Sequence, residues 1–129
     1  MDNFSFQGVV GRGDQSGKRL GFPTLNFPFQ LWPAGRRMGV YTALVNIDGH
    51  KYPGVLYAGP RYIHSERFEI LEVHVLDFAK DVYDQKVTVE VHQFLRPPFA
   101  TKTLSALIEL IEKDCKKTQA WWETQNKSA

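Results

Sequence analysis

The chain has 129 residues, of which 43% are hydrophobic and 23% charged, and its formal net charge is +2. These values predict one soluble globular domain that is long enough to bury a core. No apolar run approaches the ~20 residues of a membrane span, and the first residues lack the basic start and apolar stretch of a signal peptide. We therefore expect a cytoplasmic monomer without a membrane partner. We expect no nucleic-acid partner either, because mild basicity alone does not indicate one.

A single cysteine, Cys115, cannot form an internal disulfide, which suits a reducing compartment. It lies on a predicted helix among Leu and Ile, so we expect it to pack rather than to act as a nucleophile. No two histidines have the i, i+4 spacing of a helical zinc site. The chain also has no G-x-S-x-G, which excludes the elbow form of serine hydrolase.

Runs rich in β-branched and aromatic residues predict strands at residues 4–10, 24–27, 39–47, 50–56, 68–76 and 86–94. Asp48-Gly49 is a strong hairpin signal between two of them, because a type I′ turn needs positive φ at both central positions. Loops are expected at 29–37 and 59–61, and a turn at 81–85. About six short strands with no helix between them predict antiparallel pairing in a closed or nearly closed barrel over residues 4–94.

One helix is predicted at the end of the chain, over about residues 103–122. Thr101 or Thr103 can cap its first turn. An apolar stripe with helical spacing follows, formed by Leu104, Leu107, Ile108, Ile111 and Cys115. We expect this helix to pack across the barrel with Trp121 and Trp122 near its end, and the tail 123–129 to be frayed.

The first candidate site is a glycine-rich stretch that leads into Pro23-Thr24-Leu25-Asn26. Glycine allows backbone N–H groups to approach an anion, and lysine adds positive charge. Thr24 and Asn26 supply oxygen donors of the kind that Mg²⁺ accepts. The stretch is not a P-loop, since Arg19 stands where Ser or Thr is needed, and Ser16 breaks the protein-kinase pattern. It is either a phosphate site or an empty hairpin loop.

The second candidate is Glu72 with His74, which share strand parity with the apolar residues Phe68, Ile70 and Leu76. A carboxylate among apolar neighbours tends to have a raised pKa, which suits a general base for a hydroxyl. The alternatives are an ion pair with a lysine or arginine on the next strand, or exposure at the barrel rim. Alternation does not decide which face of this strand is the core.

The third candidate is Arg96, in Phe94-Leu95-Arg96-Pro97-Pro98-Phe99 at the end of the last strand. It could clamp a planar polar ligand, or it could neutralise a helix carboxylate such as Asp114. The residues alone favour neither interpretation.

With these features together, the chain resembles the riboflavin kinase family from about Gly8 to Asp114. The first part of the resemblance is Gly8-x-Val10-x-x-Gly13-x-x-x-Gly17-Lys18-x-Leu20-Gly21-Phe22-Pro23-Thr24-x-Asn26. Further elements follow in order: Gly39-Val40-Tyr41, Tyr52-x-Gly54-Val55, Glu72-x-His74-x-Leu76-Asp77-Phe78, Asp81-x-Tyr83, Phe94-Leu95-Arg96 and Leu107…Asp114. Pro-Thr-x-Asn and Glu-x-His in this order are the specific part.

The resemblance implies a mostly β fold, a six-stranded antiparallel Greek-key barrel with a C-terminal helix. It implies transfer of the γ-phosphate of ATP to the 5′-hydroxyl of riboflavin, giving FMN, with Mg²⁺ or another divalent cation. By resemblance, Thr24 and Asn26 hold the metal and the phosphates, and Glu72 is the base. The flap over the nucleotide would comprise Gly11, Gly13, Gly17 and Lys18, and the flavin would be bordered by Arg96, Leu107 and Asp114.

The chain departs from the family pattern in three places. Residues 56–62 replace the usual Asn-Ile-Gly and Pro-Thr, Tyr83-Asp84 replaces Tyr-Gly, and Pro98-Phe99 replaces an acidic residue after Leu-Arg-Pro. The adenylyltransferase domain that precedes this module in many bacterial enzymes is not in the sequence, so we expect the reaction to stop at FMN. A catalytically inactive flavin- or nucleotide-binding barrel, acting as a sensor or carrier, is the main alternative. A small nucleic-acid-binding barrel is suggested only by the basic pI.

Overall fold

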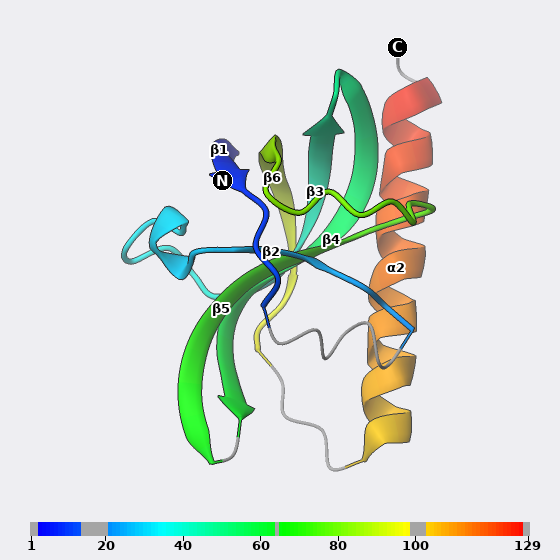
Figure 1. Ribbon diagram of the computed structural model, residues 1–129. Helices are drawn as coiled ribbons and strands as arrows, with labels where there is room; N and C mark the ends of the chain where they lie inside the picture. Colours follow the sequence, from blue (N-terminus) through cyan, green and yellow to red (C-terminus); the bar gives the residue numbers. More distant parts are fainter. Residues whose placement is uncertain (1–2, 14–20, 64, 99–102, 128–129) are drawn as a thin grey trace.

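The computed structural model describes residues 3–13, 21–63, 65–98 and 103–127. The elements in chain order are β1 (Phe4–Val9), β2 (Leu25–Phe27), the 3-10 helix η1 (Phe29–Leu31), β3 (Gly39–Ile47), β4 (His50–Ile63), β5 (Glu66–Val75), β6 (Lys86–Arg96) and α2 (Leu104–Lys127). Six strands and one C-terminal helix thus follow the predicted order, which confirms the mostly β class (Figure 1).

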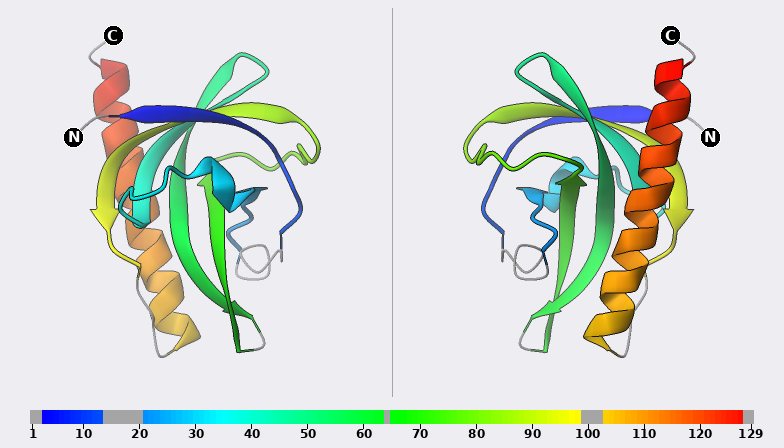
Figure 2. Two further views of the ribbon diagram at one scale, coloured as in Figure 1. Left: turned by 90° about the vertical axis from the view of Figure 1, so that its left-hand side faces the viewer. Right: turned by 90° about the vertical axis from the view of Figure 1, so that its right-hand side faces the viewer.

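The strands form one antiparallel sheet in the order β1-β6-β3-β4-β5-β2. The sheet curls until its two edge strands approach each other (Figure 2). There the N–H of Gly11 donates to the carbonyl oxygen of Asn26 at 2.7 Å, an isolated bridge between the two edges. The result is a curled sheet of six strands that this bridge nearly closes, so the end of β1 is brought beside β2.

The β3–β4 hairpin forms where the sequence predicts it. Asp48 and Gly49 have φ values of 52° and 84°, the two positive angles that a type I′ turn requires. The N–H of Gly49 also donates to the side-chain oxygen of Asn46 at 3.1 Å. This turn fixes the register of the β3–β4 pairing, from Ile47 opposite His50 to Gly39 opposite Ala58.

Two sequence predictions about the ends of elements are wrong. Residues 59–61 are not a loop, because β4 continues through them to Ile63 and pairs with β5. Beyond Ala58, β4 no longer has β3 beside it, so Pro60 lies on an edge, where a strand tolerates proline. The tail is not frayed from residue 123 either, since α2 continues to Lys127.

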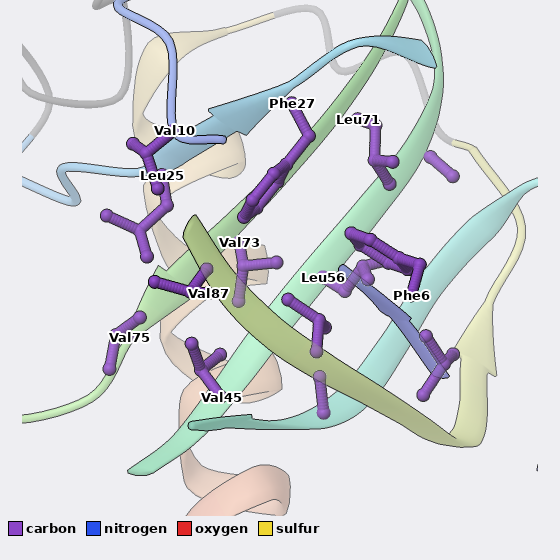
Figure 3. Packing of buried hydrophobic residues seen from close by; sticks show 14 of the residues in the cluster. Phe6, Val10, Leu25, Phe27, Val45, Leu56, Leu71, Val73, Val75 and Val87 are labelled. Carbon is purple, nitrogen blue, oxygen red and sulfur yellow. The ribbon is translucent and has the colours of Figure 1, made fainter. Parts of the chain in front are cut away.

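The core fills the inside of the curled sheet and decides the faces of β5. Leu71, Val73 and Val75 are buried there, with exposed fractions of 4% or less, together with side chains from the other strands (Figure 3). Because successive strand residues point to opposite faces, Glu72 and His74 lie on the outer face. The sequence could not decide this point, since both faces of β5 are mostly apolar.

Helix α2 packs on the outer face against β3 and β4. The hydroxyl of Thr103 accepts a hydrogen bond from the N–H of Ala106 at 3.1 Å, so Thr103 caps the first turn. The helix face that contacts the sheet is buried from Asp114 onward, at Asp114, Thr118 and Trp121, and is only half-buried earlier, at Leu107. The helix is therefore firmly docked at one end and leaves apolar side chains partly open at the other.

Cys115 is half-buried on α2, and burial raises the pKa of its thiol to about 11. The thiol is therefore protonated near neutral pH and packs, as the sequence predicts. Among the residues that the structure describes, no helix combines the length and apolarity that a membrane crossing requires.

Candidate active site

The separate sequence features meet in one row across the outer face of the sheet. Asn26 on β2 lies opposite Glu72 on β5, which lies opposite Tyr57 on β4. Tyr57 lies opposite Val40 on β3, and Val40 lies opposite Arg96 on β6. Directly opposed residues of antiparallel strands point to the same face. The two ends of the chain thus contribute to one surface, on the side of the sheet that α2 covers.

Glu72 is buried, with 6% of its surface exposed, although it lies outside the barrel core. The hydroxyl of Thr24 donates to its Oε2 at 3.1 Å. The guanidinium of Arg61 donates from Nη2 to Oε1 at 2.7 Å and from Nη1 to Oε2 at 3.4 Å. A buried carboxylate needs such charged and polar partners. The expected apolar setting is not found; the ion pair with an arginine of the next strand is.

The ion pair leaves room for a proton-accepting role. A carboxylate has about four lone-pair sites, and the three hydrogen bonds from Thr24 and Arg61 use three of them. The bonds also fix the plane of the carboxylate. Glu72 is therefore held in a fixed orientation, and the hydrogen bonds from the described residues leave one acceptor position on its carboxylate.

The side chain of Asn26 is tied to the chain on both sides of the barrel seam. Its Nδ2 donates to the carbonyl of Thr24 at 3.3 Å, to the hydroxyl of Thr24 at 3.4 Å and to the carbonyl of Arg12 at 3.5 Å. The amide nitrogen is thus used internally, and the amide oxygen is the group of this side chain that a ligand could use as an acceptor.

These donors fit a hard divalent cation. The described residues contain no group of three or more His, Cys, Asp and Glu that could hold a metal. Mg²⁺ is usually held by one or two protein oxygens together with substrate phosphates and water. The hydroxyl of Thr24 and the amide oxygen of Asn26 are suitable ligands of that kind.

The glycines of the predicted flap lie against this network where the structure describes them. Gly11 forms the bridge to Asn26. Gly13 has a φ of 57°, and a Cβ placed on it would lie 2.4 Å from Cγ and Oδ1 of Asn26. A side chain at Gly13 would therefore be strained and would collide with Asn26. Gly17 and Lys18 lie outside the described residues.

The segment before β6 supports the end of β1. The N–H of Val10 donates to the carbonyl of Gln85, and the N–H of Asp84 donates to the carbonyl of Val10, both at 2.9 Å. The guanidinium of Arg12 lies 4.2 Å from the centre of the Tyr83 ring. Asp84 has a φ of 66°, which explains why glycine suits this turn in the family pattern and why aspartate can replace it.

Arg96 neutralises a helix carboxylate, which is one of the two alternatives that its sequence left open. Its Nη2 donates to Oδ2 of Asp114 at 2.8 Å, and its Nε lies 3.2 Å from both carboxylate oxygens. Asp114 is 2% exposed. The pair ties α2 to β6, and Leu107 lies two turns earlier on the same stripe, half-buried.

The altered segment 56–62 is strand rather than loop, and it carries a residue that the sequence analysis missed. The sequence predicts a loop at Arg61 and so does not indicate its contact with Glu72. Strand parity would have put it on the face of Tyr57 and Gly59. Tyr57 itself stands between Glu72 and Arg96 in the row; its hydroxyl donates to the carbonyl of Pro60 at 2.5 Å, and burial raises its pKa.

Comparison with known proteins identifies this arrangement. The model of the family described as Flavokinase, riboflavin kinase, matches residues 1–122. The chain belongs to the riboflavin kinase family. This confirms the resemblance drawn from Pro-Thr-x-Asn and Glu-x-His.

Individual relatives are longer than this riboflavin kinase domain. The bifunctional riboflavin kinase/FMN adenylyltransferase of Pseudomonas fluorescens is 38% identical over 121 residues, which cover 91% of this chain and 38% of that protein. The trifunctional protein RibF/MnmA of Mycoplasmoides gallisepticum is 31% identical over 124 residues, 96% of this chain and 19% of its own. The RNA-binding riboflavin kinase RibR of Bacillus subtilis is 32% identical over 108 residues, which cover 83% of this chain and 46% of that protein. The chain thus spans less than half of each.

A solved structure supports the fold. The crystal structure of a protein described as a macrolide-efflux protein from Streptococcus pneumoniae matches with a TM-score of 0.78 and 25% identity, over 91% of this chain and 38% of that one. The curled six-stranded sheet with its C-terminal helix is therefore an arrangement that an experimental structure also shows.

Proposed function

We propose that the protein transfers the γ-phosphate of ATP to the 5′-hydroxyl of riboflavin, giving FMN and ADP. The observation that carries the proposal is the buried Glu72, held by Thr24 and Arg61 in one row with Asn26 and Arg96. An acceptor carboxylate beside cation and phosphate ligands is what transfer to an alcohol requires. Membership of the riboflavin kinase family supports riboflavin as the alcohol.

The chain's own residues bind and orient the reactants. Thr24 and Asn26 would hold a divalent cation such as Mg²⁺, which neutralises phosphate charge when it is bound. Glu72 accepts the proton of the 5′-hydroxyl as that oxygen forms its bond to phosphorus and the bond to the ADP oxygen breaks. Phosphoryl transfer in most analyses needs little covalent chemistry from the protein, so alignment and charge stabilisation dominate.

The flavin is proposed to lie between the first half of α2 and the outer face of β5. On the helix side, Leu107 and Ile111 are half-buried; on the strand side, Ile70 is half-buried and Phe68 is 44% exposed. These apolar side chains form a surface on which a flat aromatic ring can pack, displacing the water that otherwise covers it. Arg96 and Asp114, paired between β6 and α2, would border the flavin as polar groups.

One assay tests the proposal. The protein is incubated with riboflavin, ATP and Mg²⁺, and FMN and ADP are measured together. We expect both products in equal amounts, with no product when Mg²⁺ is chelated. Tight flavin binding without FMN would instead favour the inactive sensor or carrier, and the absence of flavin binding would exclude a riboflavin kinase.

The expectations about partners stay predictions. Because one relative is described as an RNA-binding riboflavin kinase, RNA is the nucleic acid to test, by filter binding in low salt, where nonspecific binding is strongest. We expect no retention. Size-exclusion chromatography with light scattering tests the proposed monomer.

A further inference from the structure

His74 lies one position beyond the β2–β5 pairing and contacts Pro23, which precedes the candidate phosphate-side residues Thr24 and Asn26. The two strands pair from Phe27 opposite Leu71 to Leu25 opposite Val73, where β2 begins. The next position along β5 is His74. Its ring nitrogen Nδ1 lies 2.7 Å from the carbonyl oxygen of Pro23. The side chain of His74 thus joins the two segments at a position where the backbone pairing of β2 with β5 has ended.

The chemistry of Pro23 explains why a side chain is used. Proline has no N–H, so a ladder of backbone hydrogen bonds loses a donor there. The Pro23 carbonyl can only accept, so the ring of His74 must carry its proton on Nδ1 and donate it. The ring of Phe22 packs edge-on against His74, with centroids 5.5 Å apart and planes at 84°, and holds the imidazole from another side.

The consequence falls on Thr24. This residue lies between two anchors on β5: Pro23, bound by His74, and Leu25, paired with Val73. With both neighbours fixed, the Thr24 hydroxyl is directed at Oε2 of Glu72, 3.1 Å away. Without the first anchor, Thr24 would be the first residue beyond a strand of three residues, held from one side only.

We propose that His74 is a positioning residue that holds the Thr24 hydroxyl against Glu72 and, through it, the place of the cation and phosphates. His74 acts through Pro23 and touches neither substrate. The inference rests on the proposed function, because it takes Thr24 to be a phosphate-side ligand. A purely structural role is the competing explanation. Two observations weigh against a purely structural role. The hydrogen bond of His74 lies at an exposed position, and the buried pairing of Leu25 with Val73 does not depend on it.

Three substitutions at this position separate the two explanations. In His74→Asn, the amide nitrogen occupies about the place of Nδ1 and can still donate to Pro23. In His74→Gln, the amide lies farther from the backbone, and in His74→Leu there is no donor. The matched control is His50→Leu, at an exposed histidine of the β3–β4 hairpin.

The measurements are kcat, the KM values for Mg·ATP and riboflavin, the dissociation constant of Mg·ATP without riboflavin, and the melting temperature. For His74→Leu we expect kcat/KM for Mg·ATP to fall by up to about 100-fold, since a displacement near 1 Å can have that effect. The Mg·ATP dissociation constant should rise as well. His74→Gln should show the same changes as His74→Leu, while His74→Asn should restore most of the wild-type kcat/KM and Mg·ATP affinity. The riboflavin KM and the melting temperature should change little, and His50→Leu should match the wild-type enzyme.

A second readout does not depend on catalysis. The ¹⁵N spectrum of the wild-type imidazole should show His74 protonated on Nδ1. Wild-type kinetics and Mg·ATP affinity in His74→Leu would overturn the inference while leaving the kinase proposal intact. Equal losses in His74→Asn and His74→Leu, parallel to falls in melting temperature, would also overturn it and assign a structural role. A wild-type protein that makes no FMN would overturn the proposed function and this inference with it.

Discussion

Glu72, near one end of the outer row, and Asp114, on α2 beside Arg96 at the other end, are buried carboxylates that each pair with an arginine, yet the surroundings of the two pairs differ. Around Glu72, the hydroxyl of Thr24, the guanidinium of Arg61 and the amide of Asn26 form a polar network. Gly13 lies so close to this network that an added Cβ would collide with Asn26. Around Asp114, the only described hydrogen bonds come from Arg96, and the neighbouring stripe is apolar. The arrangement around Glu72 suits proton transfer in a fixed geometry. The pair of Arg96 and Asp114 joins α2 to β6 beside the apolar surface proposed for the flavin ring.

The largest expected effect comes from removing the carboxylate on the phosphate side. Glu72→Gln keeps the shape but accepts no proton, so turnover should fall by about 10²–10⁴-fold. The Mg·ATP dissociation constant should change much less, because Thr24 and Asn26 remain. Turnover is measured as FMN formed per enzyme under saturating substrates.

The control for this substitution is Glu69→Gln, on the same strand but the opposite face and exposed. It should leave turnover unchanged. Wild-type turnover in Glu72→Gln would remove the base role and leave only the ion pair with Arg61.

The second prediction asks whether the helix-side pair is an anchor. Asp114→Asn removes the charge that compensates Arg96, and breaking a buried pair leaves an uncompensated cation. Because Arg96 keeps 20% of its side-chain surface exposed, we expect the free energy of unfolding to fall by about 2–4 kcal/mol, at the lower end of the usual cost. Urea denaturation at neutral pH measures it.

The comparison is sharpened by the kinetics of the same variant. At a temperature where it is folded, Asp114→Asn should keep the Mg·ATP KM of the wild-type enzyme while the riboflavin KM rises. A change in Mg·ATP KM with no change in stability would contradict the division between the two ends of the row.

The strands could be predicted from local chemistry, but the contacts between them could not. Val87, Val89 and Val91 alternate with polar residues, and Asp48-Gly49 determines its own turn. Gly59-Pro60 indicates a loop just as clearly, yet pairing with β5 overrides it. Local propensity is a weak guide where long-range pairing supplies the stability.

The motifs indicate Thr24, Asn26 and Glu72 as candidate site residues but do not indicate their geometry. The structure links these three side chains by hydrogen bonds, with Thr24 between the other two. The partner of Glu72 was open, because Arg61 reaches it only through the register of a long hairpin. The partner of Arg96 was open for a similar reason, since it depends on where a helix 18 residues later docks.

The third prediction concerns the space beside Asn26. Gly13 and Gly35 both have positive φ, 57° and 81°, but only Gly13 has a neighbour within 4 Å of an added Cβ. Replacing each with alanine therefore produces similar backbone strain, of roughly 1 kcal/mol, and only Gly13→Ala also displaces Asn26. We expect the Mg·ATP KM to rise about tenfold in Gly13→Ala and to stay unchanged in Gly35→Ala. Equal kinetics in the two variants would show that the polar network tolerates displacement.

The smallest expected effect is on the apolar side of the comparison. Leu107 is half-buried in the free protein, so Leu107→Ala should lower the free energy of unfolding by only about 1 kcal/mol, well below the 2–5 kcal/mol of a fully buried leucine. If a flavin ring covers this side chain, the riboflavin KM should rise about 3- to 10-fold, because the lost apolar contact is made only in the complex. Ala106→Ser, at an exposed position one residue earlier, should change neither quantity. A normal riboflavin KM in Leu107→Ala, with the same loss of stability, would mean that the partly open stripe serves the fold and that the flavin is held elsewhere on the outer face.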